Sequence, residues 1–395
     1  MEVPSNLYAP IEEVEEDVQV LFAVHKKKNA DLGMFDSRLD RVNLELDEHK
    51  IQIKQNRQSL HQLPGSTGSV VWKTSISVIP WLMKQSWFAN TLSSDVSVIE
   101  LGSGISGIGG ILLGPRVGKY IATDQIDYLK ELRENLDQNG ANMVEVSDLD
   151  WTNPPSEKEW KDASLDILCL FDCIYNPNLN THLVSTMASF AQLFPDLTCL
   201  VGQELRDPET LTDFLLKIQP YYQVFLFNYE QEGFPENMAL FLLKPYNHKA
   251  LMYAALKEAR KCEPTDSAFC IGSVLVLHGE IVSTGHSREL PGNTHAEECA
   301  IMKYLSQQPH GSSLKGTMIY STMEPCSKRL SGKKSCTDLI ISQNISTVVL
   351  GSREPDTFVK CEGVDLLKNS GVNIIEELSF QDECLKEAVR GHHGK

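Results

Sequence analysis

The sequence lacks a long apolar run. No stretch of its 395 residues approaches the roughly 20 consecutive apolar residues that a membrane-crossing helix needs. Residues 1–19 are acidic and have neither the basic flank nor the apolar stretch of a secretory signal. These absences predict a soluble intracellular protein without membrane contact, located in the cytoplasm, and they leave a nuclear location open.

Positive charge is also scarce. The chain has 36 Lys and Arg residues against 53 Asp and Glu residues, a formal net charge of −17. Residues 246–395 carry a net charge of only −1, so residues 1–245 carry −16. Because broad binding of nucleic acid relies on many Lys and Arg contacts to phosphate, this balance argues against nucleic acid as a partner. It favours a small-molecule substrate or a basic protein partner.

A disulfide framework is missing as well. The ten cysteines are dispersed, and Cys169, Cys199 and Cys270 stand in apolar, strand-like runs. A reduced thiol behaves there as a small hydrophobic side chain. No disulfide framework is therefore expected.

The length of the chain exceeds what one ordinary core needs and predicts two domains. Residues 1–66 are charged and have no clear core, so we expect an amino-terminal extension that packs on the next domain. The sequence Lys-Pro-Tyr-Asn at 244–247 interrupts the pattern of strands and helices. The expected division is an extension at 1–66, a first domain at 67–246 and a second domain at 247–395.

Apolar and amphipathic segments alternate in the first domain, which predicts an α/β fold with a mostly parallel sheet covered on both faces. Strands are predicted at 96–101, 120–123, 165–171, 197–201, 224–227 and 239–243, and helices at 126–137, 179–193 and 208–218. Within the extension, strands are predicted at 18–24 and 41–46.

The second domain opens with a helical pattern that starts near His248. Helices, one of them at 295–305, then alternate with strands predicted at 269–277, 280–283, 318–322, 347–350 and 372–375. A second α/β domain is therefore expected.

Three residues of the second domain have the chemistry and order of a catalytic zinc site. His295 opens a predicted helix, Cys326 follows a strand, and Cys336 stands further along. One imidazole and two thiolates leave the fourth tetrahedral position of zinc open for water, as in catalytic rather than structural sites. Helix amino termini at His295 and near Cys326 would favour thiolate and hydroxide. Hydroxide formed on such a zinc ion can attack a ring carbon that bears an amino group. Glu297 can carry protons from the water to a nitrogen of that ring and to the ammonia that leaves.

The same residues resemble the cytidine deaminase-like superfamily, whose signature is His-x-Glu followed by Pro-Cys-x-x-Cys. The resemblance covers 248–395 and implies a three-layer α/β/α domain. The interval between Cys326 and Cys336 is wide here, whereas compact spacing typifies nucleoside deaminases and nucleic-acid editors. A long inter-cysteine loop, together with the run Ser-Arg-Glu-Leu-Pro-Gly-Asn-Thr-His-Ala-Glu at 287–297, is very similar to the fungal deaminases of the riboflavin pathway.

This resemblance implies a substrate. It would be 2,5-diamino-6-(ribosyl- or ribitylamino)-4(3H)-pyrimidinone 5′-phosphate. This compound loses its 2-amino group to give the 5-aminouracil product. The ribityl form is the one expected in fungi. A cytidine- or dCMP-type deaminase is the alternative. The superfamily also implies a homo-oligomer, because its subunits often complete one another's pockets.

Basic residues between the two cysteines are candidates for binding the substrate phosphate, since Lys and Arg donors suit that anion. An ordinary solvated loop is an equal alternative. The candidate substrate-binding residues are Asn293, Lys328, Arg329, Lys333 and Lys334.

A glycine-rich turn in the first domain indicates a different ligand. Gly102 and Gly104 lie between a predicted strand and a helix, where glycine lets the backbone approach a ligand and the helix start offers free amides. Asp124 ends the next strand, as expected for a residue that accepts hydrogen bonds from ribose hydroxyls. Further motifs are Gly-Ser-Val-Val-Trp at 68–72, Asp-Trp at 150–151 and Asp-Cys-Ile-Tyr at 172–175.

Together these motifs resemble the seven-strand, Rossmann-like S-adenosylmethionine-dependent methyltransferases, in particular the protein-lysine methyltransferases with their Asp-x-x-Tyr motif. The resemblance spans about 67–244. It implies that S-adenosylmethionine is held by Glu100, Gly102, Gly104 and Asp124, with Trp151 near its adenine and Asp172 and Tyr175 near the methyl-transfer site. The acidic surface would suit a basic protein substrate. Two alternatives stay open: protein-lysine methylation is the main activity of the chain, or this half is a non-catalytic interaction scaffold.

Overall fold

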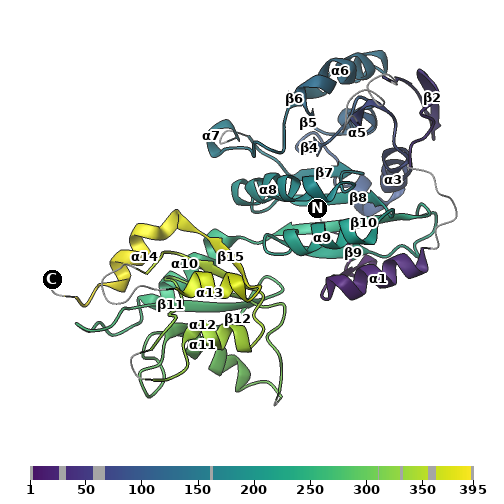
Figure 1. Cartoon of the computed structure of the whole chain (residues 1–395). Coiled ribbons are helices and arrows are strands. Elements are labelled where there is room, and N and C mark those ends of the chain that lie inside the picture. Colours follow the sequence, from purple (N-terminus) through teal and green to yellow (C-terminus); the bar gives the residue numbers. More distant parts are fainter. Residues whose placement is uncertain are drawn as a thin grey trace. The chain divides into compact units, whose positions relative to one another are not determined.

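The computed structural model describes residues 3–25, 33–56, 67–160, 163–309, 311–329, 332–354 and 362–392. The chain divides into two compact units, Met1–Tyr246 and Asn247–Lys395, and each contains its own sheet (Figure 1). Among the described residues, no helix is both long and apolar enough to cross a membrane.

The first unit contains an eight-stranded sheet in the order β1-β9-β10-β8-β7-β4-β5-β6. Its central strands pair in parallel, and β1, β9 and β10 add antiparallel pairs at one side. The predicted α/β class and the seven-strand core are confirmed, with β1 as an eighth strand. The bounds are β1 (Tyr8–Pro10), β4 (Ser97–Leu101), β5 (Lys119–Asp124), β6 (Glu145–Asp148), β7 (Ile167–Phe171), β8 (Thr198–Glu204), β9 (Tyr222–Phe227) and β10 (Met238–Pro245).

Helices cover both faces of this sheet. Alternate residues of a strand point to opposite faces, so each face contributes apolar side chains to its own core cluster. Ile99 and Leu101 pack in one core cluster with residues of α1, α8 and α9, whereas Val98 packs in another with residues of α3, α5 and α6. A hairpin of β2 (Arg41–Leu46) and β3 (His49–Lys54) adds its apolar side to the second cluster. The helices are α1 (Val14–Val24), α3 (Lys73–Lys84), α4 (Ser86–Ala89), α5 (Ile108–Leu113), α6 (Leu129–Gln138), α7 (Glu157–Trp160), α8 (Pro177–Leu193) and α9 (Pro208–Ile218).

The strand predicted at 18–24 is wrong, because these residues belong to helix α1. Val14, Val18 and Leu21 follow helical spacing and are buried, and α1 packs against α9. Three acidic residues in the first turn also favour a helix through its dipole. The β-branched run was misleading because packing against the rest of the unit outweighs local strand preference. The strand predicted at 41–46 is confirmed as β2.

The second unit is a three-layer α/β/α domain, as the resemblance implied. Its five strands have the order β12-β11-β13-β14-β15, with β13, β14 and β15 parallel and β11 antiparallel to both neighbours. Residues of α11, α12 and α13 share one core cluster, while α10 and α14 pack together and α10 contacts the sheet (Figure 1). The bounds are α10 (His248–Ala259), β11 (Gly272–Leu277), β12 (Glu280–His286), α11 (Ala296–Leu305), β13 (Met318–Ser321), α12 (Cys336–Ser342), β14 (Thr347–Leu350), α13 (Gly363–Asn369), β15 (Asn373–Glu376) and α14 (Gln381–Ala388).

Candidate zinc centre and a second cavity

Three residues of the second unit converge on one point from different elements. His295 is the residue before helix α11, Cys326 follows strand β13, and Cys336 is the first residue of α12. Nδ1 of His295 lies 3.4 Å from Sγ of Cys326 and 3.5 Å from Sγ of Cys336. A tetrahedral zinc ion, with Zn–S near 2.3 Å and Zn–N near 2.0 Å, places nitrogen and sulfur ligands about 3.5 Å apart. The three side chains therefore fit zinc.

The surroundings of Cys326 favour the thiolate that zinc requires, whereas the hydrogen bond to Cys326 and burial raise the pKa of Cys336. A hydrogen bond from the Cys336 thiol, together with the nearby His295, lowers the pKa of Cys326 to about 4. The helix expected near Cys326 begins at Cys336 instead, after the loop. Its first amide still reaches the other cysteine, since the backbone nitrogen of Cys336 donates to Sγ of Cys326 at 3.4 Å. The helix start thus donates to the sulfur atom of Cys326.

Glu297 lies in the first turn of α11 beside the ligands. Its side chain is buried, and burial raises the pKa of its carboxyl group. Oε2 lies 3.4 Å from Sγ of Cys336, on the ligand side, whereas Oε1 accepts a hydrogen bond of 2.9 Å from the hydroxyl of Ser321. Ser321 was not found from the sequence, because a single serine in an apolar strand carries no signal of such a contact.

A cavity of about 280 Å³ opens beside the three ligands. Among the candidate substrate-binding residues, Asn293, Lys328 and Arg329 line it together with His295 and Glu297. The lining does not include Lys333 or Lys334. Nζ of Lys333 donates to the carbonyl oxygen of Gly292 at 2.5 Å, and Nζ of Lys334 donates to the hydroxyl of Ser342 at 2.6 Å. The structure thus separates Lys328 and Arg329, which line the cavity, from Lys333 and Lys334, which do not.

An ion pair fixes the long loop between the cysteines. The guanidinium group of Arg329 donates to Oε2 of Glu298 at 2.8 Å, and the Arg329 side chain is only 4% exposed. The same oxygen accepts the backbone amide of His295 at 3.2 Å, which caps the start of α11. One carboxylate therefore holds the histidine ligand and the cysteine loop together.

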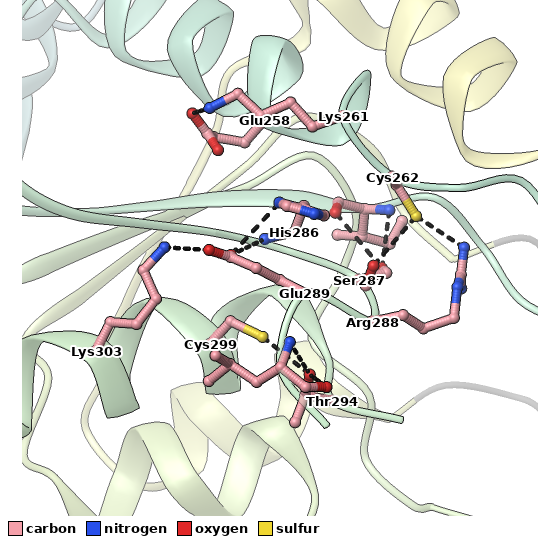
Figure 2. A network of polar contacts seen from close by, with 12 residues as sticks. Glu258, Lys261, Cys262, His286, Ser287, Arg288, Glu289, Thr294, Cys299 and Lys303 are labelled. Carbon is pink, nitrogen blue, oxygen red and sulfur yellow. Dashed lines mark hydrogen bonds and ion pairs between the residues drawn. The ribbon is translucent and has the colours of Figure 1, made fainter. Parts of the chain in front are cut away.

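The loop that leads into α11 is fixed by a second network (Figure 2). Arg288 has a positive φ of 66°, and its guanidinium group donates to the carbonyl oxygen of Glu263 at 2.6 Å and to Sγ of Cys262 at 2.7 Å. Glu289 pairs with Lys303 of α11. Near the end of the loop, the hydroxyl of Thr294 donates to the carbonyl oxygen of Leu290 at 2.9 Å. These contacts tie the loop both to the segment before β11 and to α11.

The first unit contains a separate cavity of about 460 Å³ at the carboxyl ends of β4, β5 and β7. Its lining includes all seven residues that the sequence assigned to the cofactor: Glu100, Gly102, Gly104, Asp124, Trp151, Asp172 and Tyr175. Gly102 has a positive φ of 67°, and a Cβ atom there would lie 2.7 Å from Sγ of Cys173. Glycine is therefore required at this turn.

Asp124 supports the glycine-rich turn directly. Its carboxylate accepts the backbone amides of Gly104 and Gln125, each at 2.8 Å. Burial raises its pKa to about 6. The carboxylate therefore fixes the turn as well as facing the cavity.

Sequence reasoning missed Arg206, which lines the same cavity. Its guanidinium group forms a buried ion pair with Asp172 and donates to Oε2 of Glu204 at 2.7 Å. It also lies 5.1 Å from the ring centroid of Trp72, in the geometry of a cation–π contact. The Glu-x-Arg sequence that starts at the last residue of β8 was the available signal, but nothing in it indicates the partner.

Comparisons with known proteins agree with this division. The family model for the cytidine and deoxycytidylate deaminase zinc-binding region matches residues 245–352, and the model for lysine methyltransferase matches residues 45–220. Over 405 aligned positions, the chain is 58% identical to the diaminohydroxyphosphoribosylamino-pyrimidine deaminase of Schizosaccharomyces pombe, and the match covers 100% of both proteins.

Other relatives match one half only. The ribosomal lysine N-methyltransferase 5 of Vanderwaltozyma polyspora is 26% identical over 265 residues, which cover 47% of this chain and 82% of that protein. The crystal structure of Aspergillus oryzae Rib2 deaminase is 34% identical, with a TM-score of 0.34, and covers 37% of this chain and 93% of that one.

The second unit thus has the fold and the zinc-ligand set of a cytidine deaminase-like domain. The first unit has the fold of a methyltransferase-like domain. The whole chain belongs to the family of the diaminohydroxyphosphoribosylaminopyrimidine deaminases.

Glu100 gives the first unit a testable pH dependence. Its buried carboxylate accepts hydrogen bonds from Ser103 and Tyr120, but burial raises its pKa from 4.5 to about 7. As pH rises, the Glu100 carboxyl group ionises at a lower pH in the unfolded chain than in the folded protein. The free energy of unfolding therefore falls between pH 4.5 and 7, by up to roughly 3 kcal/mol. In Glu100→Gln this loss is absent. Urea unfolding at both pH values should therefore show the variant gaining stability relative to the parent as pH rises, and a difference independent of pH would contradict this.

Proposed function

We propose that the chain removes the 2-amino group of 2,5-diamino-6-(ribosyl- or ribitylamino)-4(3H)-pyrimidinone 5′-phosphate by hydrolysis, a step of riboflavin biosynthesis. The observation that carries this function is the meeting of His295, Cys326, Cys336 and Glu297 at one cavity, in a chain that is 58% identical to a named deaminase over its full length. The substrate is a small pyrimidine phosphate. The ribityl form is the one that we propose as preferred.

His295, Cys326 and Cys336 would hold the zinc ion. When bound there, zinc would act as a Lewis acid and lower the pKa of a water molecule toward neutrality. Glu297 then performs the proton transfers: it accepts a proton from the attacking water and passes it to the ring nitrogen next to C2. A new C2–O bond forms, Glu297 carries the proton of the new hydroxyl group to the exocyclic amine, and the C2–N bond breaks to release ammonia and leave a C2 carbonyl group. Because burial raises its pKa, Glu297 can hold the proton between these transfers.

The first test is ammonia release by the zinc-loaded chain from the ribityl compound, with the ribosyl compound, cytidine and dCMP measured alongside. We expect turnover of the diaminopyrimidinone and none of the cytidine compounds. Glu297→Gln should lower kcat roughly 10²- to 10⁴-fold with an unchanged zinc content, since the proton carrier is lost and the ligands remain. Turnover of cytidine or dCMP alone would contradict the proposed substrate, and a variant at the parent rate would contradict the role of Glu297.

The placement of the basic residues suggests how the phosphate is bound. Lys328 is exposed and lines the cavity, and the lining also includes Asn293 and Arg329. The Arg329 guanidinium already pairs with Glu298, so we assign the phosphate to Lys328 and a contact with the rest of the substrate to Asn293 and Arg329. Lys333 and Lys334 have other partners and are assigned no substrate contact.

Lys328→Ala tests this assignment, with Lys334→Ala as the matched control from the same loop. We expect Lys328→Ala to raise KM for the phosphorylated substrate roughly 10-fold, because a charged hydrogen bond to phosphate is lost. KM for the dephosphorylated compound should stay the same in both variants. An equal rise of KM in Lys334→Ala, or an equal rise for the dephosphorylated compound, would contradict a phosphate contact at Lys328.

For the first unit we propose binding of S-adenosylmethionine in the 460 Å³ cavity. Its seven assigned residues meet there, and the lysine methyltransferase model matches this half. We further propose a basic protein as methyl acceptor, because residues 1–245 carry a net charge of −16. A scaffold without turnover is the second candidate. Self-association of the second unit stays a prediction.

Titration with S-adenosylmethionine tests the cofactor site. Asp124→Asn removes the charge that faces the cofactor and one of the two oxygens that accept the amides of Gly104 and Gln125, and we expect at least about 10-fold weaker binding by isothermal calorimetry. Asp148→Asn is the control, because Asp148 is the register partner of Asp124 on β6 but is exposed and does not line the cavity. No binding by the parent at near-millimolar cofactor would favour the scaffold.

A further inference from the structure

The two oxygens of the Glu297 carboxylate have different neighbours. Oε2 lies toward the zinc ligands, 3.4 Å from Sγ of Cys336. Oε1 points to strand β13, where the hydroxyl of Ser321 donates a hydrogen bond of 2.9 Å. The carboxylate therefore has one oxygen on the reacting side and one oxygen bound to the sheet.

This arrangement matters because the last torsion of a glutamate side chain is broad and roughly two-fold. A carboxylate without a fixed partner can rotate about it, and both oxygens then leave the positions that proton transfer requires. A reacting group must be held to within a fraction of an ångström to act efficiently. The donor at Oε1 selects one rotation and leaves Oε2 facing the ligands.

Ser321 is itself rigidly placed. It is the last residue of β13 and is fully buried, and its carbonyl oxygen accepts the amide of Gly351 at 2.9 Å. Its side chain lies on the same face of the strand as Ile319, which packs in the core cluster shared with α11. The sheet thus holds the hydroxyl in front of the first turn of α11.

We propose that Ser321 is a positioning residue for deamination, which acts by holding the Glu297 carboxylate in the orientation for proton transfer. This inference rests on the proposed function. Ser321 does not touch the substrate or the metal in this role, and its effect is transmitted through the hydrogen bond to Oε1. Without the hydroxyl, Oε1 loses its hydrogen bond to β13, and the carboxylate rotates away from the orientation for proton transfer.

The neighbouring strand supplies a matched control. Ser273 of β11 is the register partner of Ser321, and both side chains are fully buried. The hydroxyl of Ser273, however, donates to the backbone carbonyl oxygen of Tyr320 at 2.8 Å and not to Glu297. Ser273→Ala therefore makes the same chemical change at the same depth without touching the carboxylate.

Crystal structures of the zinc-loaded parent, Ser321→Ala and Ser273→Ala test the geometry without any assay of activity. We expect one conformer of the Glu297 carboxylate in the parent and in Ser273→Ala, and a rotated carboxylate or several conformers in Ser321→Ala. An unchanged single conformer in Ser321→Ala overturns the proposal. This result is independent of the substrate, so it stands apart from a failure of the proposed function, which would appear as no turnover by the parent.

Kinetics test the consequence. Ser321→Ala should lower kcat roughly 10- to 100-fold, with KM changed by less than about twofold and an unchanged zinc content, the range typical of residues that orient a metal site's catalytic groups. Ser321→Thr, which keeps the hydroxyl, should recover most of kcat, and Ser273→Ala should keep the parent value. A kcat within about twofold of the parent in Ser321→Ala, an equal loss in Ser273→Ala, or loss of zinc together with activity each overturns the proposal.

Discussion

The zinc centre depends on the carboxylate of Glu298. This side chain caps helix α11 through the amide of His295 and pairs with Arg329 in the loop between the two cysteines. In a compact Cys-x-x-Cys motif the backbone alone sets the distance between the thiolates, whereas here a loop of nine residues separates them. A partly buried ion pair to the neighbouring helix constrains this loop, and removing either partner leaves the other charge uncompensated. Histidine and cysteine ligands are thereby fixed in one frame.

The cavity of the first unit follows from the topology of its sheet. Parallel strands end at the same edge, so residues that follow β4, β5 and β7 face one crevice although they are far apart in sequence. Gly102, Asp124 and Asp172 each stand at or just after such an end. The ion pair between Asp172 and Arg206 compensates the charge of one of the acidic residues that line the cavity.

Most of the fold, and the principal residues of both cavities, could be read from the sequence, because periodicity marks strands and helices and the motifs stand at their ends. Contacts between distant side chains could not. Ser321 beside Glu297, Arg206 beside Asp172 and Arg329 beside Glu298 depend on how elements pack, which no local pattern records. Helix α1 was misjudged for the same reason, since its burial against α9 decides its structure. The placement of the basic residues of the loop also depends on packing: Lys328 lines the cavity, whereas Lys333 and Lys334 have hydrogen-bond partners outside its lining.

The two cavities lie in separate units of one polypeptide, each with its own sheet and core. Covalent fusion fixes their ratio at one to one. A single transcript and a single round of translation make both sites, and degradation of the chain removes both together. The cell cannot adjust the amount of one unit without the other, so any separate control must act on ligand supply or on the chemistry within a site, not on abundance.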